Sequence, residues 1–202
     1  MYKVTKSEKI AFNFISFSVF RCNMYVGLGY TLVARNVENQ SDRKDLLSKA
    51  EYHYKAALDL DHYDHLCQYY IALHYAETRR PEQAKKAVKR ALELNPEHIS
   101  AIQLTVLLLS GQKEFTEGLE LVDTVLEEFP DNLGLMSLKV RLSEVVYGGE
   151  RALNSAKDMM HQWQVAVEKM QAEEQMAEAN ANAVAASNAG MQGKQLKKLY
   201  TT

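Results

Sequence analysis

The 202-residue sequence has few of the residues that interrupt or cross-link a chain. It contains three prolines, nine glycines and two cysteines, Cys22 and Cys67, whose spacing fits no zinc site. The scarcity of turn residues, beside abundant Ala, Leu, Glu and Lys, argues against a β-sandwich or barrel and favours helices. Two isolated cysteines predict no disulfide framework, so we expect a reducing compartment.

The sequence also lacks an excess of one charge and a long apolar run. Lys and Arg number 24 against 26 Asp and Glu, and the formal net charge of −2 argues against a nucleic-acid partner. The apolar run 10–20 follows three lysines but is interrupted by Asn13, Ser16 and Ser18. Because a bilayer span needs roughly 20 apolar residues, we expect neither a signal peptide nor an integral membrane span.

The sequence does contain an internal repeat with a period of 34 residues, seen at Leu58, Leu92 and Leu126. A small residue and a proline recur at the same step: Ala50, Ala84, Gly118 and Ala152, then Pro96 and Pro130. This pattern is typical of the tetratricopeptide repeat, in which each unit is a pair of helices. It predicts an all-α helical solenoid of about four helix pairs, with repeats at residues 24–64, 65–98, 99–132 and 133–166.

The repeats differ in how closely they follow this pattern. In residues 65–98, Pro81 is expected to begin the second helix and Pro96 to follow its end. In the first repeat, Ala50 comes nine residues later than expected, and we predict an extended loop in the polar stretch 36–45. Residues 1–23 are unassigned, and residues 167–202, of low complexity and basic at the end, are predicted to be a mobile tail.

One polar cluster has the composition of a metal site: Asp59, Asp61, His62, Asp64 and His65. The repeat register places it in the turn between two helix pairs, where such residues cap helices. We therefore expect no bound metal. The sequence also has no glycine-rich phosphate loop and no nucleophile in a recognisable setting, so we expect no cofactor and no catalytic activity.

The candidate partner-binding site is the inner groove, which the first helix of each pair lines in such arrays. Steps of three and four residues place six side chains there: Leu66, Tyr69, Leu73, Gln103, Leu107 and Arg141. Chaperone-binding arrays carry a clamp of Lys, Asn and Arg for a terminal carboxylate, whereas here Tyr69, Leu73 and Gln103 occupy those places. The groove is predicted to accept a helix or another repeat.

Four segments, in order, resemble the tetratricopeptide repeat protein 7 family: residues 27–30, 61–65, 107–113 and 128–132. The likeness covers about residues 24–166 and implies that this chain carries only the central repeats of a longer family. It also implies a non-catalytic scaffold in the cytoplasm. With hyccin and a palmitoylated membrane anchor, such a scaffold holds the lipid kinase phosphatidylinositol 4-kinase type III alpha at the inner face of the plasma membrane.

Two other functions remain alternatives. A general tetratricopeptide adaptor for chaperones or a ubiquitin ligase belongs to the same class, and the absent clamp argues against it. A metal-dependent hydrolase using residues 59–65 belongs to another class, and the turn position of those residues argues against it.

Overall fold

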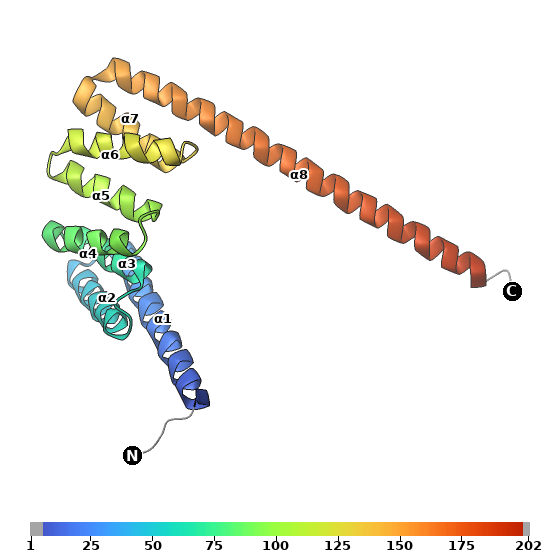
Figure 1. The fold of residues 1–202 in the computed structure, drawn as a ribbon, viewed down its shortest axis with the longest axis horizontal. Helices are drawn as coiled ribbons and strands as arrows, with labels where there is room; N and C mark the ends of the chain where they lie inside the picture. Colours follow the sequence, from blue (N-terminus) through green and yellow to red (C-terminus); the bar gives the residue numbers. More distant parts are fainter. Residues whose placement is uncertain (1–5, 200–202) are drawn as a thin grey trace. The chain divides into compact units, whose positions relative to one another are not determined.

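The computed structural model describes residues 6–199, with side chains from Ser18 to Glu178 and at Asn180. These residues form eight helices and no strand (Figure 1). The helices are α1 (Lys6–Asn36), α2 (Gln40–Leu60), α3 (His65–Glu77), α4 (Pro81–Leu94), α5 (Ile99–Gly111), α6 (Phe115–Glu128), α7 (Leu133–Tyr147) and α8 (Gly149–Leu199). The chain divides into two compact units, one ending at Val125 and the other beginning at Leu126.

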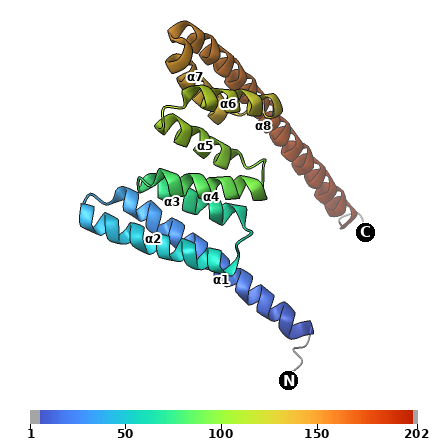
Figure 2. The same cartoon turned by 60° about the vertical axis from the view of Figure 1, so that its left-hand side comes forward.

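The first unit consists of helices that pack through small side chains. α1 and α2 lie side by side, as do α3 and α4 (Figure 2). Ala50, Ala72 and Ala84 are fully buried in one apolar cluster that extends from α2 to α5. Because these side chains end at Cβ, they let neighbouring helices approach closely. Ala50 and Ala84, two of the small positions of the 34-residue repeat, therefore lie in the core.

α1 begins at Lys6, which is earlier than the start expected for the repeats at residue 24. Phe20 and Met24 on this helix are buried together with Ala57 of α2 and Cys67 of α3. The segment left unassigned by the sequence thus supplies a core side chain. Phe20 is spaced four residues before Met24, so both lie on the face of α1 that packs on the array.

The prediction of an extended loop at residues 36–45 is wrong. Only residues 37–39 connect α1 to α2, and α2 takes up the extra residues by reaching 21 residues, against 14 in α4. The Asn39 side chain caps α2 by accepting a hydrogen bond from the Ser41 backbone N–H at 3.0 Å. Asp42 in the first turn also suits the positive end of the helix dipole. A polar stretch with a capping residue can therefore begin a solvent-exposed helix.

The predicted turn at residues 59–65 is confirmed, because α2 ends at Leu60 and α3 begins at His65. The Asp61 carboxylate accepts a hydrogen bond from the Tyr63 N–H at 2.9 Å. Asp64 caps α3 by accepting one from the Cys67 N–H at 2.8 Å. These carboxylates therefore serve the helix ends, as the repeat register predicts.

The second unit contains the end of α6 and the helices α7 and α8, which pack against each other. Gly148 separates these two helices and has a φ of +89°, a left-handed conformation that glycine adopts without steric cost. α8 then continues for 51 residues through the segment predicted to be a tail, whose mobility stays a prediction. Among the described helices, none combines the length and apolarity that crossing a membrane requires.

Candidate partner-binding site

Five of the six residues predicted for the inner groove lie on α3 and α5, which pack against each other in the first unit. Leu66, Tyr69 and Leu73 follow one another along α3 and are half-buried, as is Gln103 on α5. Leu107 is 52% exposed. The sixth residue, Arg141, is exposed on α7 in the second unit. The groove residues of the first unit therefore offer one free apolar side chain beside several partly covered ones.

The α3 residues of this face also support the core. Tyr69 and Leu73 pack against the apolar cluster of Ala72 and Ala84, and Leu66 packs against the cluster of Phe20 and Cys67. A substitution at any of the three therefore affects folding as well as binding. Leu107 is the groove residue best suited to a clean test of binding, because more than half of its side chain is open to solvent.

An aromatic cluster lies at the N-terminal ends of α3 and α5. The His98 ring contacts Tyr69 at 4.9 Å and His65 at 5.2 Å between ring centroids, both edge to face. The Nδ1 atom of His98 accepts a hydrogen bond from the Ala101 N–H at 3.1 Å, which caps α5. Burial raises the pKa of Tyr69, and burial followed by the nearby His65 lowers the pKa of His98. Both shifts favour the uncharged forms of Tyr69 and His98, which suits an apolar binding face.

A charged network joins α2 to the turn between α3 and α4. The Arg80 guanidinium donates to both carboxylate oxygens of Glu51, at 3.1 and 2.7 Å. Lys55 adds an ion pair to the same carboxylate at 2.9 Å. The hydrogen bond from Arg80 is the largest cause that lowers the pKa of Glu51, to about 2. Because the partners of Glu51 lie within the fold, we assign this network to structure and not to partner binding.

The sequence analysis did not find a hollow of about 530 Å³ between α4 and α5. Its walls are mainly apolar, with Val88 and Leu92 from α4 and Leu108 and Leu109 from α5, and Lys85 and Lys89 also line it. None of the six predicted groove residues lines it. One sequence feature could have indicated this hollow: the apolar residues of α5 occur on every side of the helix. Such a pattern is expected for a helix that is covered on more than one face.

Comparison with known proteins gives relatives that match most of this chain. Tetratricopeptide repeat protein 7B of Mus musculus is 32% identical over 148 residues, which are 72% of this chain and 18% of the mouse protein. Tetratricopeptide repeat protein 7A of Homo sapiens is 31% identical over 139 residues, 69% of this chain and 16% of the human protein. The chain thus spans less than a fifth of the length of these relatives. No family model matches it.

Solved structures share the fold at low sequence identity. Pseudomonas aeruginosa PilF has a TM-score of 0.59 and 13% identity, with 73% of this chain and 62% of PilF covered. YrrB, a tetratricopeptide repeat protein with an unusual peptide-binding site, has a TM-score of 0.52 and 18% identity, with 65% and 68% covered. The predicted all-α tetratricopeptide solenoid is confirmed, and so is the resemblance to the tetratricopeptide repeat protein 7 family.

Proposed function

We propose that this chain is a non-catalytic scaffold that helps to assemble a phosphatidylinositol 4-kinase complex and to localise it at the plasma membrane. The observation that carries the proposal is the 32% identity with tetratricopeptide repeat protein 7B over 148 residues. The partners that the resemblance implies are the lipid kinase, a hyccin-like subunit and a membrane anchor. In this proposal the chain is cytoplasmic and reaches the inner face of the membrane through these proteins.

The surface proposed to bind the partner is the groove face of α3 and α5 in the first unit. Arg141, on α7 of the second unit, is a separate candidate contact. Leu107 offers exposed apolar surface on α5, and burial favours the uncharged forms of Tyr69 on α3 and of His98 at the start of α5. Such a face suits the apolar side of an amphipathic helix, which inserts side chains at steps of three and four residues.

The proposal is tested by recovery of partners from cell extract with the Leu107→Glu variant of the full chain. A carboxylate at the centre of an apolar contact is left unpaired on binding, so recovery of the kinase and of the hyccin-like subunit should fall at least about tenfold. The control is Leu60→Glu on α2, which makes the same change at a leucine that is 45% exposed. Circular dichroism establishes that both variants keep the helicity of the unmodified chain.

Three outcomes would contradict parts of the proposal. Failure of the unmodified chain to recover the kinase complex would refute the proposed function. Equal recovery by Leu107→Glu and Leu60→Glu would move the contact away from α5. Recovery of chaperones or a ubiquitin ligase in place of the kinase would support the general adaptor.

A further inference from the structure

The hollow of about 530 Å³ between α4 and α5 lies within the first unit. Val88 and Leu108 are its most deeply buried lining residues, at 2% and 8% exposure. Leu92, Thr105 and Leu109 also line it and are half-buried. Sites for small molecules in proteins are concave, mainly apolar and about 300–1,000 Å³ in volume. The hollow therefore has the size and the lining of such a site.

The dimensions of the hollow favour a small ligand over a helix of a partner protein. Its α4 wall extends from Lys85 to Glu93, and its α5 wall extends from Thr105 to Leu109. At a rise of 1.5 Å per residue, these walls are about 12 Å and about 6 Å long. An α-helix with its side chains is about 10–12 Å in diameter, so it is too thick to enter this space. A single unbranched apolar chain is thin enough to enter.

The charged groups that line the hollow leave one positive charge uncompensated. Lys85 forms an ion pair with Glu114 at 3.6 Å, and Glu93 forms one with Arg90 at 3.0 Å. Lys89 also lines the hollow and has no ion pair with any residue whose side chain the structure describes. A ligand with a single negative charge would therefore complement the hollow.

The remaining polar group of the lining needs nothing from a ligand. The Thr105 hydroxyl donates a hydrogen bond to the Ala101 carbonyl oxygen at 2.9 Å. An apolar chain that covers Thr105 therefore leaves no hydroxyl donor unpaired. Lys85 and Lys89 are four residues apart and lie on the same side of α4. An anionic group can thus lie beside these two amines while the apolar part of the ligand enters the hollow.

We propose that the hollow binds a fatty acid, that is, one unbranched acyl chain with a terminal carboxylate. The acyl chain lies against Val88, Leu92 and Leu108, and the carboxylate pairs with Lys89. Burial of the chain supplies affinity, and the charge pair sets its orientation. This site is separate from the groove face, because none of the six predicted groove residues lines the hollow. The inference therefore does not depend on the proposed function.

The first experiment is a calorimetric titration of the full chain with dodecanoate, below the concentration at which it forms micelles. We expect one site with a dissociation constant of about 10 μM to 1 mM. Dodecyltrimethylammonium, which has the same chain and the opposite charge, should bind at least about tenfold more weakly. Hexanoate should also bind at least about tenfold more weakly, because it buries fewer CH₂ groups. No saturation by dodecanoate up to about 2 mM, or equal affinity for the cationic probe, would overturn the proposal.

A charge reversal tests the role of Lys89. Lys89→Glu should weaken dodecanoate binding about three- to tenfold, whereas Lys89→Arg keeps the charge and should change it less than about twofold. The control is Lys86→Glu, the same change at an exposed lysine of α4 that does not line the hollow. It should leave the dissociation constant unchanged. Equal losses for Lys89→Glu and Lys86→Glu would show that the general positive charge of α4, and not the hollow, attracts the carboxylate.

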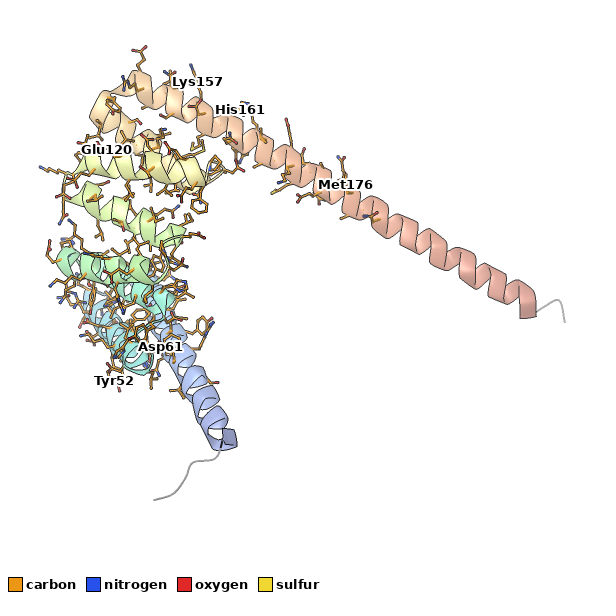
Figure 3. All side chains as sticks on the ribbon, viewed as in Figure 1. Tyr52, Asp61, Glu120, Lys157, His161 and Met176 are labelled. Carbon is orange, nitrogen blue, oxygen red and sulfur yellow. The ribbon has the colours of Figure 1, made fainter. Side chains whose placement is uncertain are left out.

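A larger side chain tests where the ligand binds. Leu109→Trp places more atoms in the hollow and should weaken dodecanoate binding at least about tenfold. The control is Tyr52→Trp, at a residue of α2 that is 70% exposed (Figure 3), and it should leave binding unchanged. Circular dichroism establishes that both variants keep the helicity of the unmodified chain.

Nuclear magnetic resonance locates the ligand on the unmodified chain, so this test does not depend on how Leu109→Trp folds. Backbone amide signals of residues 85–93 and 105–109 should shift most as dodecanoate is added. Shifts centred on any other part of the first unit, or on the second unit, would overturn the proposed site.

Vesicles distinguish a free fatty acid from a membrane surface. The full chain is sedimented with phosphatidylcholine vesicles that contain roughly one-fifth phosphatidylserine. Lys89→Glu should leave the sedimented fraction unchanged, because a lipid held in a bilayer cannot place its chain in the hollow. Vesicle binding that is lost in Lys89→Glu, in a chain that does not bind dodecanoate, would assign Lys89 to a membrane surface and overturn the proposal.

Discussion

At the scale of single residues, Gly27 shows how closely two helices approach. A Cβ atom at this position of α1 would lie 2.9 Å from the Tyr54 ring of α2 and 3.2 Å from the Ala50 carbonyl oxygen. The Tyr54 ring cannot withdraw easily, because it is buried and its hydroxyl is hydrogen-bonded to Thr31 at 3.2 Å. Glycine is therefore needed at position 27 because there is no room for a Cβ atom, and not because the backbone adopts a left-handed conformation.

We predict opposite effects for two Gly→Ala changes on α1. Gly27→Ala should destabilise the chain by about 1 to 3 kcal/mol, because the core must move to admit a methyl group. Gly29→Ala, which meets nothing within 4 Å, should stabilise it by about 0.5 to 1 kcal/mol, since alanine is the better helix former. Urea unfolding measures both. Equal signs for the two variants would show that the contact between Gly27 and Tyr54 does not limit packing.

The contribution of Glu51 to the free energy of unfolding is predicted to depend on pH. Its pKa is lowered in the fold from 4.5 to about 2, so its contribution to stability is fully present above pH 4.5 and is lost as the pH falls toward 2. Glu51→Gln should therefore cost about 1 to 2 kcal/mol at pH 7, and this difference should shrink as the pH falls through that range. Urea midpoints at several pH values give the comparison.

The control for Glu51 is Lys55→Gln. Lys55 pairs with the same carboxylate but its side chain is 58% exposed, so the loss should be below about 0.5 kcal/mol at pH 7. A loss as large as that of Glu51→Gln would contradict the central role of Arg80. A difference for Glu51→Gln that is independent of pH would show that packing, and not charge, is responsible.

At the scale of helices, the sequence predicts most boundaries because each has a local physical cause. Pro81 begins α4, and Gly148 separates α7 from α8 at a positive φ. Asp64 supplies the side-chain cap of α3. The polar stretch 36–45 was predicted wrongly because an exposed helix and a loop are equally polar. Only the Asn39 cap and the neighbouring acidic residue distinguish them.

Gly148 provides the test of a helix boundary. At φ +89° an alanine is strained although nothing lies within 4 Å of its Cβ position, so Gly148→Ala should destabilise the chain by about 1 to 2 kcal/mol. Gly149→Ala, within the first turn of α8 and equally unobstructed, should be neutral or slightly stabilising. Thermal unfolding separates the two. A neutral Gly148→Ala would mean that α7 continues into α8 without this turn.

At the scale of the whole molecule, the 34-residue period predicts the architecture because every pair repeats the same packing requirement. The candidate site is less predictable. Helical steps place Leu107 on a face, but they do not show that Tyr69 and Leu73 are partly used by the core. The hollow between α4 and α5 depends on how far apart two helices lie, and a pattern within one helix contains no such information.

The last prediction concerns how stability is distributed along the chain, measured by hydrogen exchange on the intact protein. Amides of α2 to α4, around the cluster of Ala50 and Ala84, should exchange most slowly, because opening them exposes buried apolar surface. Amides of 171–199 should exchange quickly, since the side chains of 171–178 are exposed and a helix without packing is marginal. Slow exchange throughout residues 167–199, the described part of the tail predicted at 167–202, would refute the predicted mobility.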